Sequence, residues 1–158
     1  FRPATAEDLP LLRAWRSTPP VRAWWGSEPY DGADLADPRV ARWIVSTGGR
    51  PFAFMQDYGV HDEAGHHFAG LPEGTRGIDQ FIGDPAMIGI GHGTGFIGAR
   101  TRALFAEGAP MVATDPHPDN RRAIAVYARL GFVPLGPPQE TRWGLILPMA
   151  TTRPPPGP

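Results

Sequence analysis

Residues 88–94 read Ile-Gly-Ile-Gly-His-Gly-Thr and lead into a run in which Phe96, Ile97, Ala103 and Leu104 recur at near-helical spacing. Glycine destabilises helix and strand interiors by about 0.5–1 kcal/mol, but it lets a backbone approach a ligand closely. A glycine-rich turn at a helix N-terminus offers free amides and the positive end of the helix dipole. The stretch therefore predicts a phosphate-binding turn, with a plain turn as the alternative.

Two aspartates stand where carboxylates could do chemistry. Asp79 lies in the otherwise apolar, strand-like residues 76–82, where an unpaired carboxylate is costly. Asp115 follows the buried strand expected at residues 111–114, and strand ends in α/β folds commonly face the ligand crevice. The structural alternatives are an arginine partner for Asp79 and a turn cap for Asp115.

Several other polar residues could have either a structural role or a chemical one. Tyr127 sits on the apolar face of an expected helix, so its ring can be buried while its hydroxyl reaches a site. Asn120 is a helix N-cap that could also contact a ligand, and His92 lies inside the glycine-rich turn. The cluster of histidines and acids at residues 61–67 matches no established zinc spacing, so no metal site is expected.

Composition bounds the function. The chain has 158 residues, 41% hydrophobic and 20% charged, which indicates one globular domain. All fifteen basic residues are arginine, and the absence of lysine and cysteine excludes Schiff-base, Walker-type phosphate-loop and thiolate chemistry as well as disulfides. A net charge of -1 gives no reason to expect a nucleic-acid or membrane partner. No apolar run approaches the roughly 20 residues needed to span a bilayer, and we expect a cytoplasmic enzyme or binding domain.

The elements that must position these residues alternate between strand and helix patterns. A short strand at residues 1–4 precedes a helix capped by Thr5 and Asp8, and Gly48-Gly49 predicts a hairpin. On the strand at residues 76–82, alternate side chains place Asp79 and Gln80 on opposite faces. The expected elements are helices at 5–18, 21–25, 95–108 and 120–131, strands at 40–47, 52–58, 76–82, 111–114, 132–135 and 143–147, and a loop at 59–74. They predict a mixed α/β domain over residues 1–150 and a Pro-rich, disordered tail at 151–158.

Several blocks, in order, resemble a known family. The glycine-rich turn, the helix, the short strand, the Asp-Pro-x-Pro-x-Asn segment at 115–120, the helix carrying Tyr127 and the following Gly131-Phe132 are similar to GNAT acyl-CoA-dependent N-acetyltransferases. The aminoglycoside 6'-N-acetyltransferases are resembled more closely, through Trp24-Trp25-Gly26, residues 51–58, Arg76-Gly77-Ile78-Asp79-Gln80, Thr114-Asp115-Pro116 and Arg122-Ala123-Ile124. Siderophore-biosynthesis acyltransferases share the turn and the Asp-Pro segment, but they tend to carry histidine where this chain has Asp79.

The resemblance implies an α/β GNAT fold: a single mixed, mostly antiparallel sheet with flanking helices and a central V-shaped cleft for acetyl-CoA, the co-substrate. It implies acetylation of an amino group of aminoglycoside antibiotics, at the 6' position, conferring resistance. The expected acceptor is a small polycation, and the expected assembly is a monomer or weak homodimer. The alternatives are N-acylation of a hydroxylysine-type siderophore precursor and a non-catalytic acyl-CoA-binding module.

The same resemblance assigns residues to roles. Asp79 or Asp115 assists deprotonation of the amine, with the choice left open, and Tyr127 protonates the leaving CoA thiolate. Cofactor contacts are expected from Gln80, Phe81, Ile82, Gly89, Ile90, Gly91, His92, Gly93, Thr94, Asn120 and Tyr127. Substrate contacts are expected from Trp24, Trp25, Glu28, Asp57, Tyr58, Asp79 and Asp115, with one of the two tryptophans in the core and the other at the cleft. Two departures from the family pattern are Ile88, where Arg or Gln is common, and Arg142, in a loop that is often acidic and whose positive charge bears on affinity for polycations.

Overall fold

The computed structural model describes residues 1–26 and 32–157. A seven-stranded sheet has the order β1-β2-β3-β4-β5-β9-β6, and β7 and β8 form a separate hairpin. The strands are β1 (Arg2–Pro3), β2 (Val40–Thr47), β3 (Arg50–Gly59), β4 (Arg76–Ile82), β5 (Val112–Thr114), β6 (Val133–Pro134), β7 (Gln139–Thr141), β8 (Gly144–Ile146) and β9 (Met149–Thr151). The helices are η1 (Ala6–Asp8), α1 (Leu9–Arg16), α2 (Pro19–Trp25), α3 (Gly32–Ala36), η2 (Pro85–Met87), α4 (His92–Ala106) and α5 (Arg121–Arg129).

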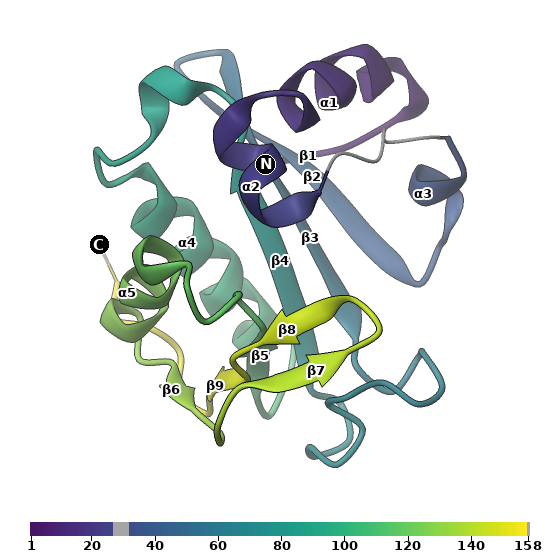
Figure 1. Ribbon diagram of the computed structural model, residues 1–158, viewed down its shortest axis with the longest axis vertical. Helices are drawn as coiled ribbons and strands as arrows, with labels where there is room; N and C mark the ends of the chain where they lie inside the picture. The colour runs from purple at the N-terminus through teal and green to yellow at the C-terminus, as the bar shows by residue number, and fades with distance from the viewer. Residues whose placement is uncertain (27–31, 158) are drawn as a thin grey trace.

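The sheet opens between its two central strands. β4 pairs with β3 along its whole length, but it pairs in parallel with β5 only at Arg76 and Gly77. Every other strand pair is antiparallel. Beyond Gly77, β4 and β5 separate, as Figure 1 shows, so that one edge of β4 has no strand partner among the described residues. This is the V-shaped opening expected in a mixed, mostly antiparallel sheet.

Each face of the sheet packs against its own helices. One core cluster includes Leu12, Trp15 and Phe54, and it lies under α1 and α2. The larger cluster, which includes Ile78, Leu104 and Phe132, lies under α4 and α5 on the other side of the sheet. Figure 1 shows α1 and α2 together above the sheet and α4 beside α5. Alternating residues of β3 and β4 are buried in both clusters, and the larger cluster also contains Val112 of β5 and Met149 of β9. The larger cluster therefore joins the two arms of the opening, β1–β4 on one side and β5, β9 and β6 on the other.

The expected strands and helices appear close to their predicted bounds, but α3 and β7 are not among them, and further differences lie at the C-terminal end. The strand expected at residues 143–147 is β8, but it pairs with β7 in the separate hairpin. The main sheet instead receives β9, which the sequence did not suggest because it is three residues long and follows Pro148.

The tail also differs from expectation. Thr151 belongs to β9, so the domain does not end at residue 150. Pro155 is buried, and Arg102 Nη1 donates a 3.0 Å hydrogen bond to the carbonyl oxygen of Pro156. The described tail therefore contacts the domain through Thr151 in β9, the buried Pro155 and the bond from Arg102 of α4, and the predicted disorder of residues 151–158 stays a prediction.

Candidate active site

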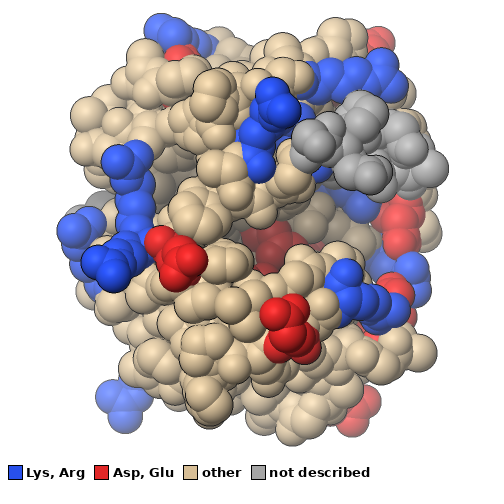
Figure 2. All heavy atoms as spheres, viewed as in Figure 1, with Lys and Arg blue, Asp and Glu red and all other residues tan. Residues whose placement is uncertain are grey.

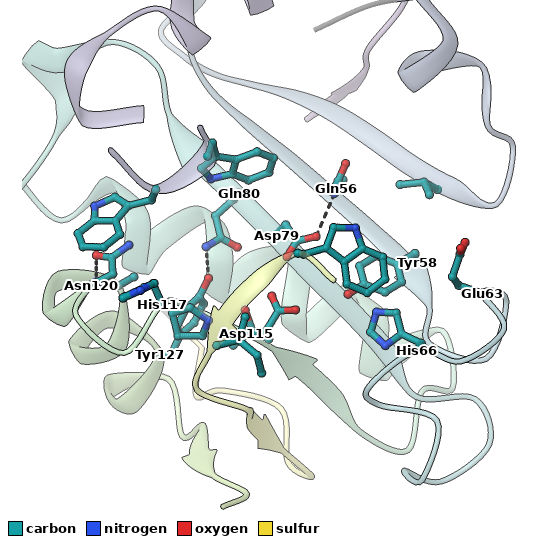
Figure 3. Close-up of a pocket in the computed structure, with 18 residues that line it drawn as sticks. Gln56, Tyr58, Glu63, His66, Asp79, Gln80, Asp115, His117, Asn120 and Tyr127 are labelled. Carbon is teal, nitrogen blue, oxygen red and sulfur yellow. Dashed lines mark hydrogen bonds between the residues drawn. The ribbon is translucent and has the colours of Figure 1, made fainter. Parts of the chain in front are cut away.

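A cavity of about 410 Å³ lies where β4 and β5 separate. Figure 2 shows this face of the molecule hollowed near its centre, with acidic atoms at the bottom of the hollow. Eight of the residues predicted from the sequence line the cavity: Trp24, Trp25, Tyr58, Asp79, Gln80, Asp115, Asn120 and Tyr127. The structure thus brings together side chains from α2, β3, β4, the end of β5 and α5 (Figure 3).

Asp79 and Asp115 face one another at the bottom of this cavity (Figure 3). Gln56 Nε2 donates a 2.9 Å hydrogen bond to Asp79 Oδ2, and His67 Nε2 lies 2.9 Å from Asp115 Oδ2. Burial is the main cause that raises the pKa of Asp79 to about 8, and the neighbouring charge of Asp115 adds to it. Burial likewise raises the pKa of Asp115 to about 7. The two carboxyl groups therefore behave as a coupled pair that shares a proton near neutral pH.

The raised pKa values suit the pair to proton transfer. A carboxylate with an ordinary pKa near 3.9 is a poor base for an ammonium group. A base whose pKa lies near the working pH is both deprotonated often enough and strong enough to accept a proton. The pair can therefore take a proton from an amine that enters the cavity.

Tyr127 has both features expected of it, a buried ring and a hydroxyl that reaches the cavity. Its ring is 3% exposed and packs 5.5 Å from the ring of Phe132, while its hydroxyl lines the cavity. The Gln80 side-chain amide donates a hydrogen bond to that hydroxyl. Burial raises the pKa of Tyr127 well above its usual value, so the hydroxyl stays protonated at neutral pH. It is therefore available as a proton donor at the junction of the two arms.

The substitution Tyr127→Phe is expected to lower kcat by about 10²-fold, the low end of the range for a lost general acid. The low end is expected because a thiol of pKa near 8.5 leaves tolerably well as a thiolate. Steady-state rates between pH 6 and 9 check this prediction. A Tyr127→Phe enzyme with the parent kcat at all pH values would remove Tyr127 from the chemistry.

A second cavity, of about 170 Å³, lies between α2, α4 and α5 and borders the first. Gln80 and Asn120 line both cavities. The free edge of β4 offers unpaired backbone N–H and C=O groups there, which suit a ligand that carries amides. Predicted cofactor-binding residues on its wall are Gln80, Phe81, Ile82, Gly93, Asn120 and Tyr127, although the Phe81 ring itself stacks in the core on Phe54.

The glycine-rich turn leads into α4 as predicted. Gly89 and Gly91 have φ values of 78° and 93°, in the left-handed region that favours glycine, and Gly91 is the N-cap of α4. Ile90 is 63% exposed. The His92 ring packs 5.1 Å from the ring of Phe52. The backbone N–H groups of His92, Gly93 and Thr94 belong to the first turn of α4, where N–H groups have no partner within the helix.

The substitution Gly91→Val is expected to weaken acetyl-CoA binding at least about 10-fold, because a β-branched residue resists positive φ and the turn would rearrange. No neighbouring atom lies within 4 Å of a Cβ placed there, so the effect comes from the backbone conformation. His92→Ala, the control, should change the dissociation constant little. Isothermal titration with acetyl-CoA measures both, and normal binding by Gly91→Val would contradict the phosphate role.

One predicted substrate contact is wrong. Asp57 is fully buried on the α4 side of the sheet, where it accepts hydrogen bonds from Arg76, Arg100 and Trp43. Side chains alternate along a strand, so the neighbouring Tyr58 faces the cavity while Asp57 faces the opposite side. Predicted substrate residue Glu28 lies outside the described residues.

Gln56, which the sequence analysis missed, faces the cavity beside Tyr58 and holds Asp79. Counting by two along β3 from Tyr58 would have found it.

The two tryptophans divide as expected. Trp25 packs 5.1 Å from Phe81 in the core beneath α2. Trp24 is 46% exposed and its ring lies 5.6 Å from that of His117, across the cavity mouth. Both also line the cavity. Their predicted contact with substrate therefore stays a prediction with a geometry that allows it.

The histidine-rich loop and the β7–β8 hairpin close one side of the cavity. His66 and His67 stack at 4.1 Å, and Trp143 of the hairpin lies 5.2 Å from the ring of His66. Arg142 donates a 3.2 Å hydrogen bond to the carbonyl oxygen of Ala64 and lies 3.5 Å from Glu63 Oε1. The charge of Arg142 is therefore partly balanced.

The histidines have separate partners. His61 contacts the carbonyl oxygen of Ala69, and His66 Nδ1 accepts from the backbone N–H of Phe68. Across the residues that the structure describes, no group of three or more His, Asp or Glu side chains is arranged to hold a metal ion. In the same residues, no helix is both long and apolar enough to cross a membrane. The contact of His67 with Asp115 joins residues 48 positions apart, and no local pattern could have indicated it.

Comparisons with known proteins agree with this geometry. Residues 4–139 match the model of an acetyltransferase (GNAT) domain. Aminoglycoside N(6')-acetyltransferase type 1 of Klebsiella pneumoniae is 31% identical over 145 residues, covering 84% of this chain and 72% of that protein. The structure of AAC(6')-Ib in complex with parmomycin and acetyl-CoA has a TM-score of 0.86 at 29% identity, covering 96% of this chain and 92% of that one. The same enzyme in complex with coenzyme A and kanamycin has a TM-score of 0.85 at 29% identity over 96% and 93% of the two chains.

Proposed function

The chain belongs to the GNAT family of acetyltransferases, and we propose that it transfers the acetyl group of acetyl-CoA to the 6'-amine of an aminoglycoside, conferring resistance. Family and fold agree with what the sequence resemblance implied. One observation carries the proposal: two buried carboxyl groups with raised pKa values meet beside a protonated tyrosine hydroxyl where two cavities join.

The chemistry that we propose is direct transfer in a ternary complex. The amine nitrogen attacks the thioester carbonyl, an amide bond forms and the carbon–sulfur bond breaks. The Asp79–Asp115 pair accepts the proton that the amine loses, and the Tyr127 hydroxyl gives a proton to the departing thiolate. The open edge of β4 and the first turn of α4 hold the donor in register with the pair.

The cavity suits a polycationic amino sugar. The Asp79–Asp115 pair, which shares one proton, and Glu63 supply negative charge along its wall. Trp24 and Tyr58 supply rings that can stack on cations or sugar faces, whereas the guanidinium of Arg142 lies over the Trp143 ring at 4.3 Å. The guanidinium of Arg142 is held against the loop at residues 59–74 by its contacts with Glu63 and the carbonyl oxygen of Ala64. We therefore propose that this departure from the family pattern leaves room for a polycation.

A thiol-release assay with acetyl-CoA tests the function. With kanamycin or ribostamycin as the acceptor, the enzyme is expected to release the thiol of coenzyme A, whereas an aminoglycoside with a hydroxyl at the 6' position should give little release. Thiol release with hydroxylysine but with no aminoglycoside would favour the siderophore-type reaction. Coenzyme A binding without release from any amine would leave a binding module and sink the enzyme proposal. A monomer or weak homodimer stays a prediction for sedimentation analysis.

A further inference from the structure

His67 is held tightly beside the carboxylate pair without lining the cavity itself. Its side chain is 7% exposed. The ring stacks on His66 at 4.1 Å and packs 4.5 Å from Phe68 and 5.6 Å from Trp143. Its Nε2 lies 2.9 Å from Asp115 Oδ2. The packing leaves the ring one orientation, with Nε2 aimed at the carboxyl group.

The other ring nitrogen identifies the tautomer. Nδ1 is buried, and within the described part of the chain no hydrogen-bond partner lies within its reach. A proton on Nδ1 would leave that buried N–H without an acceptor and would also turn the lone pair of Nε2 toward the Asp115 carboxylate, so two groups rather than one would go unsatisfied. Burial lowers the pKa of His67, which keeps the ring neutral with a single N–H. The proton therefore sits on Nε2, where Asp115 accepts it.

This hydrogen bond distinguishes the two aspartates. A ring N–H bonds an ionised carboxylate more strongly than a neutral carboxyl group, so it favours the charged form of Asp115. Over the residues that the structure describes, Asp79 has a single amide donor, Gln56 Nε2, whereas a bond with its own backbone N–H adds to that of His67 in favouring the charged form of Asp115. When the Asp79–Asp115 pair holds a single proton, that proton is therefore on Asp79.

We propose that His67 is a positioning residue whose Nε2–H fixes Asp115 as the anionic carboxylate that takes the amine proton, leaving Asp79 as its protonated partner. The inference rests on the proposed acetyl transfer. In the reaction the amine proton moves to Asp115 Oδ and the nitrogen lone pair forms the new amide bond. Other titratable groups that face the pair come from all sides: Tyr58, Glu63, His66, Arg142, His117 and Tyr127.

The tautomer is measured on the free protein without any substrate. Nitrogen-15 correlation spectra at pH 7 should show His67 protonated at Nε2 only, with the signal assigned by its loss in His67→Phe. A proton on Nδ1, or a doubly protonated ring, would overturn the proposal. This arm is independent of whether an amine substrate has been found, so its failure is distinguishable from failure of the proposed function.

Kinetics test the role in the reaction. In His67→Phe, which keeps the stacked ring, the acidic limb of the kcat/KM profile should move up by about one pH unit, a tenfold change in proton affinity. The KM for acetyl-CoA should stay the same. His67→Gln, which can place an amide donor near the position of Nε2, should recover at least half of the shift. His61→Phe, in the same loop but outside the cavity, is the control and should match the parent.

Substitution of each aspartate provides the last test. Asp79→Asn should retain at least about tenfold more activity than Asp115→Asn, since it keeps the anionic base. Melting temperatures of all variants separate a folding defect from a change in the pH profile. A His67→Phe profile that coincides with the parent, a glutamine variant no better than phenylalanine, or equal or reversed activities of the two asparagine variants would each overturn the assignment.

Discussion

The double variant Asp79→Asn/Asp115→Asn is expected to lose about 10²–10⁴-fold in kcat/KM for an aminoglycoside, the usual range for a lost general base. The amides keep the shape of the carboxyl groups, but they neither accept the amine proton nor attract the polycation. KM for the aminoglycoside should therefore rise while that for acetyl-CoA changes little. Initial rates at saturating acetyl-CoA measure both effects, and a variant with parent activity would contradict the role of the pair.

The same variant is expected to be more stable than the parent at pH 8. The folded-state pKa values of about 8 and 7 lie above the ordinary value for aspartate, so the folded protein binds more protons than the unfolded chain between about pH 4 and pH 8. Stability of the parent therefore falls as pH rises through this window, whereas the amides do not titrate. The gain at pH 8 should reach roughly 1–3 kcal/mol.

Melting curves between pH 5 and pH 8 check this, and the gap between variant and parent should widen toward pH 8. The exposed pair Asp62→Asn/Asp119→Asn removes the same formal charge and serves as the control, with no such gap expected. A double variant that melts below the parent at pH 8 would show that the carboxyl groups are stabilising rather than costly.

Replacing Asp57 by alanine is expected to destabilise the fold by about 3–5 kcal/mol, the range for breaking a buried ion pair from one side. Asp57 is fully buried, with Arg76 Nη2 at 2.6 Å, Arg100 Nε at 2.8 Å and Trp43 Nε1 at 2.9 Å from its oxygens. Burial alone would raise the pKa of Asp57, but these hydrogen bonds lower it below its usual value. Alanine would remove this anion from Arg76 and, among the residues described, would leave Arg100 with only the exposed Glu107 as an anionic partner, at 3.4 Å.

Urea unfolding at pH 7 measures this loss. Asp37→Ala, which removes a partly exposed aspartate from its pair with the exposed Arg39, is the matched control and should shift the midpoint far less. Asp57→Asn keeps an acceptor for Trp43 and should fall between the two. An Asp57→Ala midpoint equal to that of Asp37→Ala would mean that the ion pairs contribute nothing to the fold.

Asp57 also shows where reasoning from sequence stopped short. It was grouped with Tyr58 because both residues fall in one block that resembles the family, yet alternation along β3 places them on opposite faces. The same alternation on β4 turns Asp79 toward Gln56 and Gln80 toward Tyr127, although both residues line the cavity. In both strands, the alternation of side chains between the two faces of the sheet indicates which residues can share a site.

The sequence by itself determined most of the elements and their order, the glycine-rich turn at residues 88–94 and the set of blocks that identifies the family. These depend on local preferences and spacing, which neighbouring residues carry. Only the tertiary structure decided that Asp79 and Asp115 meet in an enclosed cavity and that His67 reaches Asp115. Burial and the proximity of charges set pKa values, and both arise only when distant segments pack together.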